Sequence, residues 1–314
     1  MQHVTSLSDV HLSRPAVVSI GVFDGVHRGH QHLIGKLVDE AKQRDLTPAV
    51  LTFYPHPATV LAGFKPGSYL TLPNAKAELL GALGVEIVVT HPFNEHVRFM
   101  RAADFVDALC RYLKMQSLWV GSNFALGYER EGDIEFLTRQ GEISGFAVHA
   151  VELYQDEKGV HISSTRIREA LAAGDVSGAQ RLLGRPYRVP GTVVEGAKRG
   201  RTIGIPTANL DVGDEQAFPA NGVYAAYALL GSKRHEAVVN IGVRPTFDGT
   251  PRPVIEAHLL RFSQEIYGSS LSLEFIQRLR DERKFAGVDE LLAQIHSDIQ
   301  TARTLFAELA GSSH

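Results

Sequence analysis

Residues 17–30 read VVSIGVFDGVHRGH and join a strand pattern to a helix pattern. A run of mostly β-branched residues, 17–22, ends in the turn-forming triplet F-D-G at 23–25. Beyond two histidines, His27 and His30, apolar residues recur at helical spacing from residue 33 to residue 41. The stretch therefore predicts a buried strand that turns directly into an amphipathic helix, with both imidazoles on one side of the helix start.

This arrangement suits a phosphate. A helix N-terminus carries free backbone N–H groups and a partial positive charge. Gly25 and Gly29 would let a ligand approach the backbone closely. A pair of histidines three residues apart is more often a surface or core feature when it stands alone. Together with the strand, the F-D-G turn and the glycines, however, it favours a site that binds a nucleoside triphosphate and stabilises charge on the reacting phosphate.

Composition places the chain among ordinary globular proteins. It has 314 residues, 44% of them hydrophobic and 21% charged, which is enough for two domains. Its formal net charge of −3 gives no support for a general nucleic-acid or membrane-surface role. A chain with a single cysteine, Cys110, cannot form an internal disulfide, which fits a protein of the reducing cytosol. Cys110 itself falls in an apolar helix pattern and is expected to be an inert core residue. We expect no secretory signal and no membrane helix, which would need ~20 apolar residues.

The first part of the chain alternates between strand and helix patterns, which predicts an α/β, Rossmann-like domain over residues 1–186 with a parallel sheet covered by helices. Expected strands are 17–23, 48–53, 85–90, 117–121 and 146–153; expected helices are 30–44, 74–83, 102–113 and 164–173. Asn74 is the expected N-cap and Gly84 the expected stop of the second helix. Ligands of such sheets lie beyond the carboxyl ends of the strands, where the two histidines fall.

The pattern changes near residues 184–186. Short β-rich runs broken by glycine and proline follow, at 187–194, 222–229, 236–241, 254–262 and 270–279. They predict a small antiparallel β-barrel in a second domain, residues 187–314. A long amphipathic helix, apolar from Leu291 to Leu309 on one side, is expected to pack on that barrel.

Two further motifs lie in the first domain. Residues 162–168, ISSTRIR, place three hydroxyl residues at a helix start. They read either as a generous N-cap or as a phosphate clamp to which Arg168 adds charge-assisted bonds. Residues 121–127, GSNFALG, follow a strand and read as a plain loop or as a ligand-lining loop.

The second domain carries a basic glycine loop, residues 196–204, and then Thr207 and Asn209 at alternate positions. By spacing alone such a loop is more often a solvated turn. In an extended segment, however, the two side chains face the same way, and their oxygens suit Mg²⁺. Alternation around Glu256 predicts that this carboxylate and His258 share the face opposite Ile255, Ala257 and Leu259.

The motifs resemble those of bacterial bifunctional riboflavin kinases/FAD synthetases over residues 15–305. G-V-F-D-G-V-H-R-G-H and ISSTRIR resemble the two signatures of FAD synthetases, and residues 121–127 are similar to their flavin- and nucleotide-lining loop. Leu126 stands where that loop usually has a second aromatic residue, which puts ring stacking there in doubt. G-I-P-T-A-N resembles the P-T-A-N motif of riboflavin kinases, and later matches include 221–224, 240–246, 256–259, 267–268 and 279–285.

The resemblance implies a multifunctional transferase that makes flavin cofactors. The second domain would phosphorylate riboflavin to FMN with ATP, releasing ADP, and the first would join FMN to AMP, forming FAD and pyrophosphate. Mg²⁺ would accompany ATP at both sites. We expect a cytoplasmic enzyme with no nucleic-acid or membrane partner. The oligomeric state, homo-oligomer included, is left open by the sequence.

The resemblance also implies roles for individual residues. In the first domain, catalytic or ATP-binding roles fall on Gly21, Phe23, Asp24, Gly25, His27, His30, Ser163, Ser164, Thr165 and Arg168, and flavin binding falls on Asn123 and Phe124. In the second, ATP and flavin binding fall on Gly196, Lys198, Gly204, Pro206, Thr207, Asn209 and Arg283. Thr207 and Asn209 would bind the metal, and Glu256 would be the general base.

Two other functions are compatible with parts of this pattern. An adenylyltransferase acting on a nicotinamide or pantetheine phosphate would explain residues 1–186 but leave the P-T-A-N domain without a purpose. A non-catalytic flavin-binding module would need the flavin pocket but not Glu256, Thr207, His27 and His30 together.

Overall fold

The structure is a computed structural model that describes residues 1–63, 67, 69–196, 204–244 and 252–311. The chain divides into two compact units, Met1–Ser164 and Thr165–His314. Within the described ranges, none of the helices combines the length and the apolar character that crossing a bilayer needs.

The first unit is built on a six-stranded sheet with the order β1-β4-β3-β2-β5-β6, in which every neighbouring pair is parallel. Its strands are β1 (Gln2–Val4), β2 (Ala16–Ile20), β3 (Thr47–Tyr54), β4 (Ile87–Pro92), β5 (Met115–Gly121) and β6 (Ala147–Val151). This confirms the predicted parallel α/β architecture. The short edge strand β1 has too few residues for a periodic signal and was not predicted.

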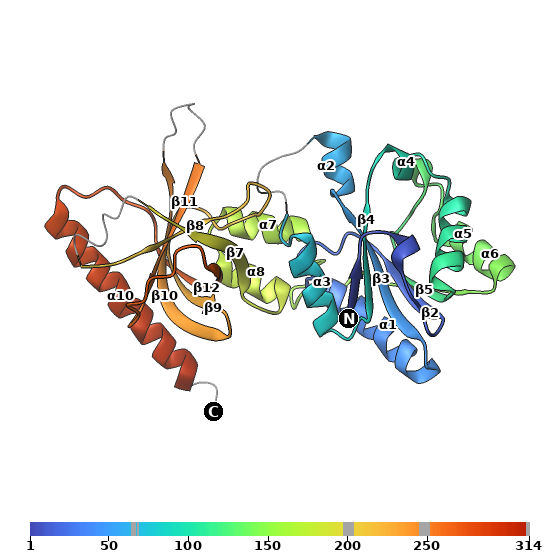
Figure 1. The fold of residues 1–314 in the computed structure, drawn as a ribbon, viewed down its shortest axis with the longest axis horizontal. Coiled ribbons are helices and arrows are strands. Elements are labelled where there is room, and N and C mark those ends of the chain that lie inside the picture. Colours follow the sequence, from blue (N-terminus) through green and yellow to red (C-terminus); the bar gives the residue numbers. More distant parts are fainter. Residues whose placement is uncertain (64–66, 68, 197–203, 245–251, 312–314) are drawn as a thin grey trace. The chain divides into compact units, whose positions relative to one another are not determined.

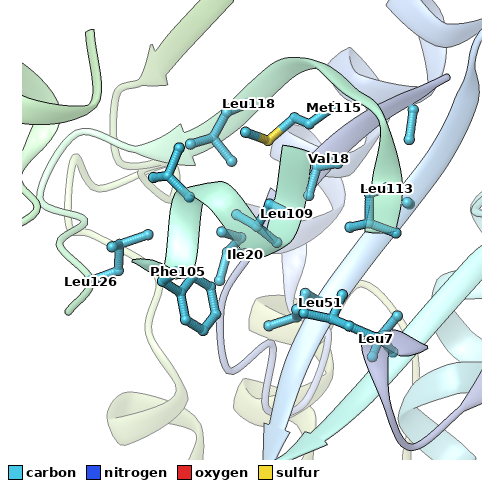
Figure 2. Packing of buried hydrophobic residues seen from close by; sticks show 14 of the residues in the cluster. Leu7, Val18, Ile20, Leu51, Phe105, Leu109, Leu113, Met115, Leu118 and Leu126 are labelled. Carbon is cyan, nitrogen blue, oxygen red and sulfur yellow. The ribbon is translucent and has the colours of Figure 1, made fainter. Parts of the chain in front are cut away.

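Helices cover both faces of this sheet (Figure 1). The helices of this unit are α1 (Arg28–Arg44), α2 (Pro57–Ala62), α3 (Pro73–Ala82), α4 (Glu95–Arg98), α5 (Ala102–Leu113) and α6 (Ile134–Ser144), with 3₁₀ turns η1 (Leu7–Asp9) and η2 (Tyr128–Arg130). Helices α1 and α3 pack on one face, and α4, α5 and α6 pack on the other, whereas α2 belongs to neither cluster. Side chains of β2 alternate between the faces: Val17 packs with α1 and α3, whereas Val18 and Ile20 pack with α5. Figure 2 shows the hydrophobic cluster on the α5 side of the sheet, which includes Val18, Ile20, Phe105 and Leu109.

The second unit contains α8 (Val176–Leu183) and a closed antiparallel barrel, β10-β11-β8-β7-β12-β9. The helix α7 (Ser164–Ala172) begins at the boundary between the units. Barrel strands are β7 (Tyr187–Val194), β8 (Ala208–Asp211), β9 (Gly222–Leu230), β10 (Lys233–Arg244), β11 (Arg252–Leu259) and β12 (Ser270–Arg280). The last helix, α10 (Val288–Gly311), packs Ala302 and Phe306 against Val223 and Ala225 of the barrel. Both the barrel and the packing of its helix were predicted.

Some predicted boundaries are wrong for local reasons. Asn74 is not an N-cap: Pro73 already begins α3, and the cap residue Leu72 makes no side-chain cap bond. The strand predicted to reach Phe23 ends at Ile20, because Phe23 has a positive φ of 49° that no strand residue adopts. Gly84 does follow the end of α3, with φ 101°.

Candidate active sites

The turn between β2 and α1 is strained. Phe23 has φ 49° and Val26 has φ 40°, in the left-handed region that non-glycine residues rarely occupy. Such residues cost of order 1–3 kcal/mol each and persist where their surroundings fix them. Gly25, with φ 81°, takes the same region without that cost. The F-D-G turn therefore needs support from other segments.

The carboxylate of Asp24 supplies the first support. It is 1% exposed and accepts the backbone N–H of Leu70 at 3.0 Å and 3.1 Å and that of Thr71 at 3.0 Å. The Thr71 hydroxyl in turn accepts the N–H of Gly25 at 2.9 Å. The turn is thus bound reciprocally to the segment before α3. These hydrogen bonds form a clamp between the F-D-G turn and residues 70–71. Asp24 was predicted to contact ATP, but its carboxylate is part of this clamp.

Two hydrogen bonds to the backbone carbonyl of Val22 stabilise the turn further. This carbonyl lies just past the last ladder bond of β2, from the Gly21 N–H to the Leu51 carbonyl. It accepts the Thr52 hydroxyl at 2.9 Å and the Lys76 ammonium at 2.7 Å. Neither donor was predicted to belong to the site.

Lys76 is an unusual residue for an apolar helix face. It is 3% exposed on α3, and burial lowers its pKa to about 8, although the nearby Asp24 acts in the opposite direction. Keeping this group charged at neutral pH costs on the order of 3 kcal/mol of stability. The only sequence signal was a lysine within the run from Ala75 to Leu80, where an apolar residue would pack better.

The two histidines form one unit at the start of α1. His27 is the N-cap, and its Nδ1 accepts the backbone N–H of His30 at 3.3 Å. The two rings are stacked, with centroids 3.6 Å apart and planes 16° from parallel, and the Phe23 ring meets His30 edge-on at 5.2 Å. Gly29 gives room for this: a Cβ there would lie 3.2 Å from Cε1 and Nδ1 of His27. The expected orientation of both imidazoles to one side is confirmed.

His30 is neutral at physiological pH in this environment. Burial, with the nearby His27 and Lys76, lowers the pKa of His30 well below 6.5. Its Nδ1 is buried without a hydrogen-bond partner among the described residues. A neutral imidazole can donate one N–H hydrogen bond to a phosphate oxygen, but it brings no positive charge to the site.

The hydroxyl motif meets the turn at one residue. The Ser164 hydroxyl donates to the Asp24 carbonyl at 2.8 Å, so the start of α7 lies against the F-D-G turn. Ser163 precedes α7, and Thr165 and Arg168 lie on its first two turns. The structure thus brings Ser164 to Asp24 across 140 residues of sequence.

The loop after β5 lies at the carboxyl edge of the same sheet. Asn123 is exposed, and its carbonyl accepts Arg130 at 3.1 Å; Phe124 packs against the core cluster. Leu126, at the position of the expected second aromatic, is 9% exposed and belongs to that core. Leu126 therefore packs inward as part of the fold.

The second site lies on two neighbouring barrel strands. In the β8–β11 register, Asn209 is directly opposite Glu256, and Ala208 is opposite Ala257. Ile255 and Ala257 are fully buried while Glu256 is partly exposed, which confirms the predicted face. Side chains directly opposite in an antiparallel pair lie about 5 Å apart at Cβ, so the amide and the carboxylate are neighbours.

Residues before β8 complete this face. The His258 ring donates from Nδ1 to the Pro206 carbonyl at 2.8 Å, which ties the P-T-A-N segment to β11. Gly196 lies so close to Asn209 that a Cβ would fall 2.1 Å from its amide nitrogen. Gly204 is exposed with φ 77°, and Lys198 lies outside the described residues. Arg283, farther along, donates to Gln294 at 2.6 Å and lies over the Phe285 ring.

A pocket opens beside the P-T-A-N segment within the second unit. Its lining is mostly apolar, with a few hydroxyl and carboxyl groups: Val193, Pro206, Thr207, Ala208, Ala257, Leu259, Phe262, Ser263, Gln264, Glu265, Ile266 and Tyr267. Thr207 lies in this wall, whereas Glu256 points to the other face of β11. A mostly apolar pocket with a few polar groups is typical of sites for small-molecule ligands.

Oxygen ligands are available for a hard cation on this face. In the described parts of the chain no cluster of three His, Cys, Asp or Glu residues could hold a metal ion. The hydroxyl of Thr207 and the amide oxygen of Asn209 are ligands of the kind that suits Mg²⁺, which takes few protein ligands and keeps phosphates and waters in its shell.

Family comparisons match both units. The FAD synthetase family model matches residues 9–166, and the riboflavin kinase family model matches residues 183–306. The bifunctional riboflavin kinase/FMN adenylyltransferase of Pseudomonas fluorescens is 39% identical over 298 residues, with 95% of each chain covered. Those of Bacillus subtilis and Escherichia coli K12 are 37% and 40% identical and cover 96% and 92% of this chain.

A solved structure gives the same architecture. A chain from Streptococcus pneumoniae, described as a macrolide-efflux protein, superposes with a TM-score of 0.88 at 32% identity and covers 96% of this chain and 98% of its own. The likeness extends over both units. The efflux description belongs to that protein.

The environment of His30 predicts an unusual titration. In an NMR titration, the ring C–H signals of His30 should remain those of a neutral imidazole as the pH falls through 6.5, because burial holds its pKa well below that value. A His27→Ala sample would identify the signals of the neighbouring ring by their absence. A midpoint near 6.5 for His30 would mean that the ring is solvated and that the stacked arrangement is wrong.

Proposed function

The chain belongs to the family of bifunctional riboflavin kinases/FMN adenylyltransferases, and we propose that it divides the two reactions between its parts. Residues 187–314 phosphorylate the ribityl 5′-hydroxyl of riboflavin with ATP. Residues 1–186 transfer AMP from a second ATP to the phosphate of FMN, and pyrophosphate leaves. The two family matches do not overlap: the FAD synthetase model ends at residue 166, and the riboflavin kinase model begins at residue 183, four residues before this division.

Adenylylation needs no enzyme nucleophile, because the FMN phosphate itself attacks the α-phosphorus. The protein contributes alignment and stabilisation of charge. We assign these roles to His27 and His30, to the α1 N-terminus behind them, and to Ser164, Thr165 and Arg168. Asn123 and Phe124 are assigned to the flavin. The stacked, N-capping geometry of the histidines supports this, since it places both rings at the positive N-terminal end of α1.

In the kinase reaction Glu256 accepts the proton of the attacking hydroxyl. Thr207 and Asn209 would hold Mg²⁺, which neutralises charge on the transferred phosphoryl group when bound. ATP and flavin contacts are assigned to Gly196, Lys198, Gly204, Pro206 and Arg283. The observation that carries the assignment is the register of β8 and β11, which sets Asn209 opposite Glu256.

The rival functions fit this chain less well. An adenylyltransferase of another substrate class has no use for a barrel with the P-T-A-N segment and Glu256. A flavin-binding module needs neither a strained histidine turn nor a carboxylate beside metal-ligand oxygens. Incubation with riboflavin, ATP and Mg²⁺ separates all three, because only the bifunctional enzyme yields both FMN and FAD.

The role of Glu256 is tested with Glu256→Gln. Glutamine keeps the shape but cannot take up the proton, so kcat for FMN formation from riboflavin should fall about 10²–10⁴-fold while flavin binding is retained. FAD formation from added FMN should be unchanged. Glu236→Gln, on the neighbouring strand β10, is the matched control. Near-normal FMN production by Glu256→Gln would remove this carboxylate from the mechanism.

The histidine geometry is tested with Gly29→Ala beside Gly35→Ala. Both glycines lie in α1, where alanine favours the helix by roughly 0.5–1 kcal/mol, but only a Cβ at residue 29 meets the His27 ring, whereas one at 35 meets nothing within 4 Å. We expect Gly29→Ala to slow FAD formation from FMN about 10-fold or more, since small displacements of catalytic groups are costly. Equal rates in the two variants would show that the ring position does not matter.

A further inference from the structure

We propose that Lys76 is a positioning residue for adenylyl transfer: its buried ammonium anchors the F-D-G turn through the Val22 carbonyl and adds positive charge behind the histidine pair. The proposal rests on the assignment of adenylylation to the first part of the chain. Lys76 itself lies on α3 and would touch neither substrate.

The contacts of Lys76 locate its effect. Its Nζ lies 2.7 Å from the Val22 carbonyl and 3.3 Å from the Thr52 hydroxyl. The next residue along the chain is Phe23, whose positive φ turns the backbone out of β2 and whose ring meets His30. A shift of the Val22 carbonyl would therefore pass through Phe23 to the histidine rings.

Satisfying the carbonyl alone does not require a lysine. The Thr52 hydroxyl already donates to it at 2.9 Å. A buried ammonium adds a second bond at a cost in stability, and replacing such charges by apolar groups of similar volume is often neutral or stabilising. Costly buried charges of this kind concentrate at functional sites, where they act on reacting charge through a low-dielectric interior.

The charged surroundings of Lys76 are consistent with that role. Asp24 stabilises the ammonium from the turn, and its own carboxylate is bound by backbone N–H groups. Lys76 on α3 and His27 at the start of α1 both disfavour a proton on His30. Lys76 thus helps to keep His30 a neutral N–H donor while leaving a positive charge behind the helix terminus that would face a triphosphate.

The first test is Lys76→Met, which keeps the length and volume of the side chain but removes charge and donor. We expect kcat for FAD formation from FMN to fall about 30-fold or more, with KM for FMN changed less than about 3-fold, because the loss lies in alignment at the transition state. FMN formation from riboflavin should be unchanged and the thermal midpoint no lower. Lys36→Met, on the exposed side of α1, controls for loss of one positive charge.

The second test needs no variant. Lys76 loses its proton near pH 8, so kcat/KM of the wild-type enzyme for FMN adenylylation should decline as the pH rises through that region. The phosphate groups of the substrate titrate near pH 6 and do not contribute. In Lys76→Met this decline should be absent, leaving a low rate that is flat over the same range.

The outcomes separate the proposals. Three results would each overturn the role of Lys76. The first is FAD formation by Lys76→Met at a rate within about 3-fold of wild type. The others are a wild-type kcat/KM that stays constant up to about pH 10, and a decline of kcat/KM with pH that persists in Lys76→Met. Loss of FAD formation together with a lower thermal midpoint would show a structural role only. His27→Ala is measured alongside: if it also leaves FAD formation intact, the assignment of adenylylation to this unit fails, and not merely the role of Lys76.

Discussion

The buried carboxylate of Asp24 is the constraint on which the first site depends. A strand that ends at Ile20 must turn within a few residues into a helix that begins at Arg28, and it does so through two non-glycine residues with positive φ. That backbone is unfavourable by itself. Asp24 holds it by accepting the N–H groups of Leu70 and Thr71, bonds to a charged acceptor worth about 1.5–3 kcal/mol each. The stacked histidines, the N-terminus of α1 that His27 caps and the contact with Ser164 all follow from the turn that this carboxylate fixes.

The second site rests on a different kind of constraint. Its key residues are held by strand register and not by a buried charge: an antiparallel pair sets Asn209 opposite Glu256, and His258 binds the Pro206 carbonyl. Register in a closed barrel is strongly specified, because a slip of one residue would expose Ile255 and Ala257 and bury Glu256. Each half of this bifunctional enzyme thus positions its chemistry with the device natural to its fold, a strained strand-to-helix turn in the parallel sheet and a fixed ladder in the barrel.

Periodic patterns predicted the elements that carry both sites. The bounds of α5 agree with the predicted 102–113, and the face of Glu256 followed from simple alternation. Long-range partners could not be predicted in this way. The clamp joins Asp24 to residues 46 and 47 positions away, and nothing local in the segment before α3 reveals it. Lys76 is one of two charged residues of α3, and no local pattern shows that it is buried while Glu78 is exposed. Strand β8, with four residues, is too short to show a period. The family motifs include Asp24 but not Thr71, Thr52 or Lys76, which bind the same turn from other segments.

Hydrogen exchange at Leu70 and Thr71 tests the central role of Asp24 most directly. If the carboxylate holds the turn, these two amides should be strongly protected in the wild-type enzyme and exchange much faster in Asp24→Ala, while amides of the β2–β3 ladder keep their protection. FAD formation from FMN should be lost in the same variant and FMN formation from riboflavin retained. Unchanged protection of both amides in Asp24→Ala, with FAD formed at the wild-type rate, would contradict the account.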